Sequence, residues 1–312
     1  MTRANCPSLP FRKSGPRPEG WRRALILAGV LALYATAPAG GQAMKPPARI
    51  ASLNLCGDEL LLRLVDRERI ASVTFLAADP AMSNVADLVH GLRLNRGLAE
   101  EVIPLKPDLV ITGVFTTRAT TDLLRMLGVP VLELPMPETL DQAYAQIRDV
   151  AARVGEPERG ATMIARLKAD FAALPAPHGP ERSAIVLRPN GFTAGKGSLA
   201  DDLMTRAGLR NLAARLSTDR LGQLPLEEIV VARPDLLIVD SAPDAPPSLA
   251  QAILDHPALS MLHREGRTVP LPARLWACPG PNLAEAARRL ADAPRQPAPQ
   301  ALAPVGASTG VP

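Results

Sequence analysis

A twelve-residue segment occurs twice in this chain. Residues 100–111 (EEVIPLKPDLVI) are matched by residues 227–238 (EEIVVARPDLLI), at an offset of 127 residues. In each copy the acidic pair favours a helix start, a basic residue with Pro-Asp ends the helix, and apolar residues indicate a buried parallel strand. The repeat predicts two related α/β halves with the functional site between them. A chance match of a common helix-to-strand connection is the alternative.

Short apolar runs alternate with helical patterns in both halves. Strands are predicted at 49–53, 70–74, 109–112, 129–134, 184–187, 236–239 and 268–271, and a last helix at 282–291. This alternation indicates parallel sheets with right-handed crossovers. The predicted fold class is α/β, with two Rossmann-like lobes at 48–138 and 183–292. Ligands of such sheets bind beyond the carboxyl ends of the strands.

Two helices are predicted between the lobes, within 139–175. Thr139 and Gln142 form a capping-box pattern, and apolar residues with helical spacing follow as far as Val154. After a Gly-Glu-Pro break, a second helix of about 17 residues would be about 25 Å long. One long helix that braces both lobes would restrict hinge motion, so we expect only small closure.

The first 43 residues have the pattern of an export signal. A basic head precedes an apolar run from Ala24 to Ala35, and small residues before Met44 would allow cleavage near Ala43. The run is too short to span a bilayer. Residues 294–312 are rich in Pro, Ala and Gln, which predicts a disordered tail.

Charge outside the leader is balanced. The leader holds six of the 35 Lys and Arg residues but one of the 31 acidic residues. The remaining chain has no basic surplus, which argues against nucleic-acid binding.

Aromatic residues are few and lie after predicted strands. Outside the leader there are six, of which four follow strands, in loops expected to line a cleft: Phe75, Phe115, Phe192 and Trp276. Flat apolar side chains there suggest contact with a large organic ligand, although each could instead fill the core of its own lobe. Arginines at 93, 96, 118, 188 and 274 accompany these loops, and Arg118 and Arg274 are the strongest candidates for binding an anionic ligand.

No catalytic motif is found. The stretch 191–198 resembles a phosphate loop, but it has one residue too few between its glycines and a glycine between Lys196 and Ser198. With only four histidines, a metal held directly by the protein is disfavoured, which leaves a metal already wrapped in an organic ligand. We therefore predict a binding protein without a catalytic residue, a cofactor or a resident metal. An exported α/β enzyme with its site at the lobe junction is the alternative.

Two cysteines, Cys56 and Cys278, remain outside the leader. Each follows a strand, so both belong to loops that face the cleft from opposite lobes. Three states stay open: a disulfide across the cleft, two buried thiols too far apart to join, and a thiolate pair that contacts the ligand.

The order of these elements resembles a known family. A basic leader, the segment 49–56, the EExxxxKPDL element, the bracing helix and a late Trp276-x-x-x-Gly280-Pro281 occur in the order typical of periplasmic binding proteins for iron-siderophores, haem and cobalamin. The resemblance covers about residues 49–291. It implies a monomeric, bilobed protein of the periplasm that delivers an iron chelate or a corrinoid to an inner-membrane ABC permease. It also implies that Glu100 and Glu227, at equivalent positions, dock on the two permease subunits.

Overall fold

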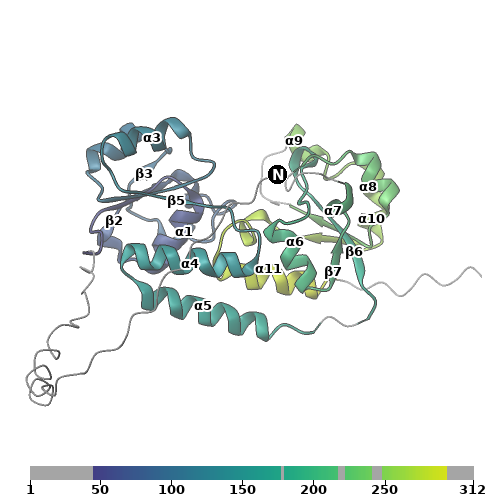
Figure 1. Cartoon of the computed structure of the whole chain (residues 1–312). Helices are drawn as coiled ribbons and strands as arrows, with labels where there is room; N and C mark the ends of the chain where they lie inside the picture. Colours follow the sequence, from purple (N-terminus) through teal and green to yellow (C-terminus); the bar gives the residue numbers. More distant parts are fainter. Residues whose placement is uncertain (1–44, 177–178, 217–221, 241–247, 294–312) are drawn as a thin grey trace, which may run out of the picture. The chain divides into compact units, whose positions relative to one another are not determined.

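The computed structural model describes residues 45–176, 179–216, 222–240 and 248–293, which belong to one compact unit that begins at Lys45. The predicted leader at 1–43 and the predicted tail at 294–312 lie outside these described residues. The described chain contains two parallel sheets, one in each lobe (Figure 1). No helix in these ranges is long and apolar enough to cross a membrane.

The first sheet has the order β3-β2-β1-β4-β5 and the second has the order β7-β6-β8-β9. The strands are β1 (Ile50–Ser52), β2 (Ile70–Thr74), β3 (Leu94–Asn95), β4 (Leu109–Gly113), β5 (Val131–Leu134), β6 (Arg182–Leu187), β7 (Leu209–Asn211), β8 (Leu236–Val239) and β9 (Thr268–Pro270). All seven predicted strands are confirmed. The two short edge strands β3 and β7 were not predicted, because two or three residues carry no periodic pattern.

Eleven α-helices are found among the described residues, and most of them cover the sheets. They are α1 (Leu55–Leu64), α2 (Ala99–Val102), α3 (Arg118–Met126), α4 (Leu140–Val154), α5 (Pro157–Ala172), α6 (Leu199–Arg206), α7 (Ala213–Leu216), α8 (Leu226–Ala232), α9 (Leu249–Ala252), α10 (Ser260–Arg264) and α11 (Asn282–Ala291). The predicted last helix matches α11.

The two copies of the repeated segment adopt the same turn. Lys106 and Arg233 both have left-handed backbone conformations, with φ of 50° and 46°. The carboxylate of Asp108 then accepts hydrogen bonds from the backbone N–H of Ala48 (2.7 Å) and Arg49 (2.9 Å) at the start of the first strand. In the second lobe Asp235 does the same for Ser183, through its backbone N–H and its hydroxyl, both at 2.7 Å. Each Asp therefore ties the entry of one central strand to its neighbour.

Thr139 is the N-cap of helix α4, as the capping pattern predicts. The Thr139 hydroxyl accepts a hydrogen bond from the Gln142 N–H at 3.2 Å. The reciprocal bond differs from a standard capping box, since the Gln142 side chain accepts from the N–H of Glu138 instead. The helix ends at Gly155, whose φ of 79° suits a left-handed cap.

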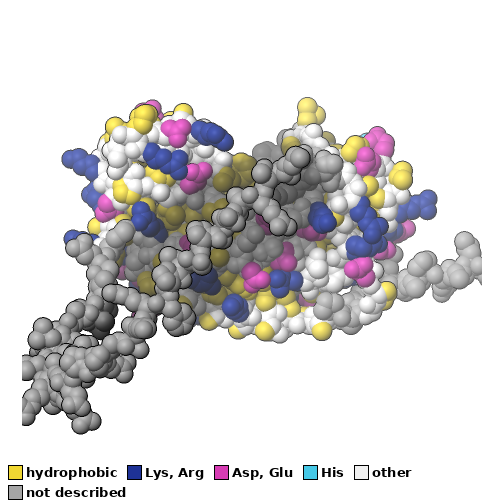
Figure 2. Space-filling model, in the orientation of Figure 1, with side chains coloured by type: hydrophobic (Ala, Val, Ile, Leu, Met, Phe, Trp, Pro, Cys, Tyr) yellow, Lys and Arg dark blue, Asp and Glu magenta, His cyan; other side chains and the backbone are white. Residues whose placement is uncertain are grey.

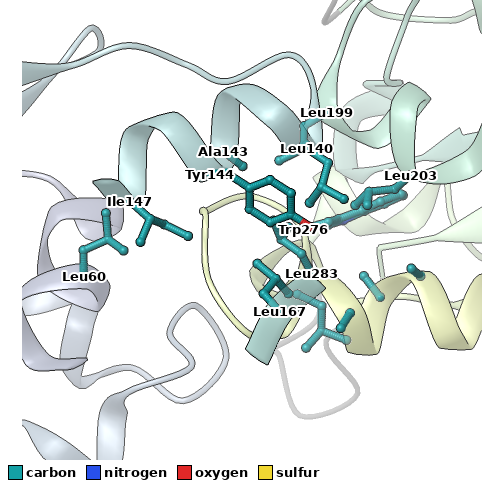
Figure 3. Packing of buried hydrophobic residues seen from close by; sticks show 14 of the residues in the cluster. Leu60, Leu140, Ala143, Tyr144, Ile147, Leu167, Leu199, Leu203, Trp276 and Leu283 are labelled. Carbon is teal, nitrogen blue, oxygen red and sulfur yellow. The ribbon is translucent and has the colours of Figure 1, made fainter. Parts of the chain in front are cut away.

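One hydrophobic core runs through both lobes, and α4 lies at its centre. Figure 3 shows Ile147 of α4 beside Leu60 of α1, and Leu140 of α4 close to Leu199 of α6. The backbone N–H of Leu140 also donates to Asp202 of α6 at 2.8 Å. Helix α5 packs on α4 and α11. The bracing role expected of one long helix is therefore shared by two, with α4 in contact with helices of both lobes.

Candidate functional site

A cavity of about 280 Å³ lies between the carboxyl ends of the two sheets. Its wall is mainly apolar, and Figure 2 shows hydrophobic side chains along the hollow between the lobes. The apolar lining residues are Leu55, Val114, Phe115, Leu134, Pro135, Met136, Pro137, Val186, Ala194, Leu199, Ala200, Trp276 and Ala277. The polar ones among the described residues are Asn54, Glu138, Gln146, Arg188 and Ser198. A largely apolar cavity with few polar groups is typical of a site for an organic ligand.

Asn54 sits at the first-lobe wall with its orientation fixed. Its Oδ1 accepts hydrogen bonds from the backbone N–H groups of Cys56 (3.0 Å) and Gly57 (3.2 Å), which caps α1. Because these partners can only donate, the amide nitrogen Nδ2 must point the other way. It lies against Gly113, where a Cβ would come within 2.4 Å of Nδ2. Only glycine fits there without moving Asn54.

Arg188 occupies the second-lobe wall. Its Nε donates to Oδ2 of Asp240 at 3.3 Å, and Oδ1 of the same carboxylate accepts from the N–H of Ala273 at 2.7 Å. Asp240 is thus held by the backbone and in turn orients the guanidinium. The planar fork leaves its Nη donors for other partners.

Gln146 of α4 contributes to the cavity floor and is buried. Its Nε2 donates to the carbonyl of Pro135 at 3.1 Å, while its Oε1 is buried without a hydrogen-bond partner. A buried amide oxygen without a partner costs free energy of folding. Gln146 is also one of the few polar side chains among the residues that line the cavity.

A disulfide joins Cys56 to Cys278 and forms part of the cavity wall. The S–S distance is 2.06 Å and the Cα atoms are 5.0 Å apart. Of the three states left open by the sequence, the structure therefore contains the bonded one. The bond connects the first turn of α1 in the first lobe to the loop before α11 in the second.

A polar contact also joins the lobes. Nδ2 of Asn84 donates to the Arg274 carbonyl at 2.6 Å, and Nη1 of Arg274 donates back to Oδ1 of Asn84 at 2.9 Å. Asn84 is held in turn by the carboxylate of Glu59, which accepts from its N–H at 3.0 Å and from its Nδ2 at 2.9 Å. Burial raises the pKa of Glu59, although the bonds from Asn84 and the charge of Arg63 oppose the shift. No sequence pattern predicts this contact, because its two residues are 190 positions apart.

Asp58 lies next to Glu59 in α1 and is fully buried. Its carboxylate accepts from the Thr74 hydroxyl at 2.5 Å and from the Thr74 N–H at 3.2 Å. Burial raises its pKa to about 7, and the Thr74 bonds offset only part of that effect. Asp58 is not among the residues that line the cavity.

The predicted ligand residues divide into two sets. Cys56, Phe115 and Trp276 line the cavity; Phe115 is 75 % exposed at its rim and Trp276 is 5 % exposed in its wall. The other four are not among the lining residues: Phe75, Arg118, Phe192 and Arg274. As ligand contacts all seven stay predictions. The guanidinium of Arg274 bonds Asn84, and Phe192 forms an isolated β-bridge with Gln223.

The loop at 191–198 forms one side of the cavity. The N–H of Gly197 donates to the Asp201 carboxylate at 3.0 Å, and the Ser198 hydroxyl caps α6 by accepting from the Asp201 N–H at 3.2 Å. The loop N–H of Gly197, which a bound phosphate would use, is therefore already paired with a carboxylate.

Among the described residues, no group of three or more His, Cys, Asp or Glu side chains is arranged to hold a metal ion.

The predicted docking residues Glu100 and Glu227 are both exposed in the first turns of α2 and α8. Their neighbour Glu101 is engaged, since its carboxylate accepts from the N–H of Arg96 at 2.6 Å.

A model of the periplasmic binding protein family matches residues 50–263, which include strands of both sheets and most of the cavity wall. The chain belongs to this family. A protein from Halobacterium salinarum named cobalamin-binding protein is 22% identical, and the match covers 87% of this chain and 84% of that protein. The ABC transporter substrate-binding lipoprotein YvrC of Bacillus subtilis is 24% identical over 62% of this chain and 64% of its own length.

A solved structure extends this likeness to the fold. The periplasmic heme-binding protein RhuT from Roseiflexus sp. RS-1, in its apo form, is 26% identical with a TM-score of 0.63. The match covers 78% of this chain and 98% of RhuT. The two-lobed α/β architecture is therefore that of a periplasmic binding protein.

Proposed function

We propose that this member of the family is an exported solute-binding protein. It captures an iron chelate, such as a siderophore or haem, or cobalamin, and delivers it to an inner-membrane ABC permease. The observation that carries the proposal is the apolar cavity at the carboxyl ends of two parallel sheets, with Phe115 and Trp276 in its wall. Aromatic faces of this kind suit a flat macrocycle or a bulky chelate.

The relatives support cobalamin and haem as ligand classes and an ABC transporter as the partner. One is named for cobalamin and one solved structure for heme, and YvrC is named as a substrate-binding lipoprotein of an ABC transporter. The chain acts by binding and release, without a catalytic step, and works as a monomer.

The site of action is the periplasm. Residues 1–43 direct export and are cleaved near Ala43. The disulfide between Cys56 and Cys278 supports an oxidising compartment.

Docking on the permease uses Glu100 and Glu227. Both are exposed and stand at equivalent positions of the repeated segment. Glu100→Lys with Glu227→Lys should abolish ligand uptake by cells while the purified protein binds ligand as before, because both residues are exposed and neither lines the cavity. Glu158→Lys, in the exposed first turn of α5, is the matched control. Normal uptake by the double variant would exclude this docking surface.

Binding can be tested directly. Trp276 is the only tryptophan outside the leader and lies in the cavity wall, so its fluorescence reports ligand entry. Mass spectrometry of the natively purified protein identifies any retained ligand, and titration with cyanocobalamin, a ferric hydroxamate siderophore and haemin measures affinity. Submicromolar binding of at least one of these without turnover is expected. Absence of binding to all three, or chemical conversion of one, would refute the proposal.

A further inference from the structure

The strand registers make Asn54 and Arg188 equivalent residues of the two lobes. Ile50 of β1 pairs with Leu109 of β4, and Ala184 of β6 pairs with Leu236 of β8. Counting four residues on from Ile50 and from Ala184 reaches Asn54 and Arg188. Both line the cavity, each from the end of a central strand of its lobe.

The residues that support them are equivalent as well. The same register relates Gly113, at the end of β4, to Asp240, just after β8. Gly113 gives Asn54 the space that a Cβ would fill, and Asp240 pairs with the Arg188 guanidinium. Each lobe thus presents one positioned N–H donor group at the same point of the same scaffold.

The charges at these two points are small. Asn54 is neutral, and the charge of Arg188 is compensated by Asp240 at 3.3 Å. Among the described residues of the cavity wall, Arg188 is the one basic side chain and Glu138 the one acidic side chain. A cavity that balances its charges and is otherwise apolar gains nothing from a multiply charged ligand, because each ligand charge would lose its hydration without a counter-ion.

We propose that Asn54 and Arg188 form a two-point donor pair that selects an uncharged metal complex with carbonyl oxygens on two edges. This inference rests on the proposed function and narrows it. The carboxamides of a corrinoid and the hydroxamate carbonyls of a neutral ferric trihydroxamate share this chemistry. The two carboxylates of haem and the multiple charges of a ferric catecholate do not.

The test uses Asn54→Asp and Arg188→Gln in the full-length mature protein. Asp keeps the oxygen that caps α1 but replaces the Nδ2 donor by an acceptor, so folding is preserved and recognition is not. Arg188→Gln removes the guanidinium fork. The matched controls are Asn190→Asp, at an exposed left-handed position, and Arg166→Gln, on the exposed face of α5.

Affinities are measured by calorimetry for cyanocobalamin, the neutral ferric complex of the cyclic trihydroxamate desferrioxamine E, haemin and a ferric tris-catecholate. The wild type should bind one of the two neutral probes more tightly than either charged probe. Each site variant should weaken that binding about tenfold or more, which corresponds to about 1.4 kcal/mol, while both controls bind as the wild type does.

The possible failures are distinct. Tighter binding of haemin or the tris-catecholate by the wild type would overturn the selectivity but leave the proposed function intact. Unchanged affinity in both site variants would overturn the donor pair. Failure of the wild type to bind any of the four probes would refute the proposed function, and this inference with it.

Discussion

The two lobes share a scaffold but differ at the ends of their central strands. At the strand entries, Asp108 and Asp235 both accept hydrogen bonds from the start of the neighbouring strand, which include a backbone N–H in each lobe. At the opposite, carboxyl ends, the equivalent positions hold a neutral amide packed on glycine in one lobe and an arginine paired with aspartate in the other. The entry side keeps residues that fix register, whereas the exit side varies the groups that face the cavity. The residues that hold the strands in register, Asp108 and Asp235, therefore lie at the opposite end of the sheets from the cavity residues Asn54 and Arg188.

The largest expected effect comes from unlinking the lobes. Replacing both Cys56 and Cys278 by Ser removes a bond between residues separated by 222 positions. In the chain-entropy model such a bond stabilises the folded state by about 5 kcal/mol. Denaturant unfolding of the double variant should show a loss of this order, with the lobes unfolding in separate steps. A loss below about 1 kcal/mol and a single transition would show that α4, α5 and the Asn84–Arg274 contact join the lobes without the disulfide.

The second prediction uses pH to compare the lobes. The pKa of Asp58 is higher in the folded chain, at about 7, than its ordinary value of 3.8, so the folded state binds the proton more tightly. The associated stabilisation is complete below about pH 4 and is lost as pH rises through 7, by about 1.4 kcal/mol per pKa unit. Wild-type stability should therefore fall from pH 5 to pH 8, and Asp58→Asn should flatten that slope.

Asp235 should behave in the opposite way. Burial acts to raise its pKa, but the Ser183 hydroxyl and N–H and the nearby Arg267 hold the pKa below its ordinary value. Its contribution is present above that ordinary value and is lost as pH falls through the depressed folded value. Asp235→Asn should reduce only the acid-side loss. Equal pH slopes in the wild type and both variants, from thermal unfolding at each pH, would contradict the assignment of these groups.

A smaller effect is expected from Gly113→Ala. The new Cβ would lie 2.4 Å from Nδ2 and 2.9 Å from Cγ of Asn54, so the amide must move and the cap on α1 weakens. Overpacking and cap loss together should cost about 1 to 3 kcal/mol of unfolding free energy, and ligand affinity should fall as well. Asp240→Asn in the other lobe should lower affinity with less loss of stability. Equal losses of unfolding free energy in Gly113→Ala and Asp240→Asn would contradict this expected difference between the two lobes.

The smallest change should be seen in closure. Helix α4 contacts α1 in one lobe and α6 in the other, and the disulfide and the Asn84–Arg274 contact add two further links. Small-angle scattering should therefore show nearly the same radius of gyration with and without ligand. A large compaction on binding would show that these links permit hinge motion.

Much of the fold followed from the sequence because its signals are local. Apolar runs such as 236–239 and the Pro-Asp turn before them determine strands without reference to the rest of the chain. Cys56, Phe115 and Trp276 were placed near the cavity by the general rule that ligands bind after strand ends.

The remaining site residues depend on contacts that are distant in sequence. Arg274 resembles a ligand residue until its partner Asn84, 190 positions away, is known. Asn54 and Arg188 follow strands, and Arg188 was noted among several loop arginines, but their equivalence requires the registers of four strands. Gln146 looks like an ordinary polar position of an amphipathic helix, and only the placement of α4 under the cavity distinguishes it.

The disulfide also determines when the binding site can exist. One half of this wall segment is Cys56 and the other is Cys278, so the wall stays incomplete until nearly the whole folded chain has been synthesised. A nascent chain therefore has no finished cavity, even when its first lobe is folded. Completion of the cavity wall is therefore a late event in the synthesis of this chain, since it requires residues from both ends of the folded region.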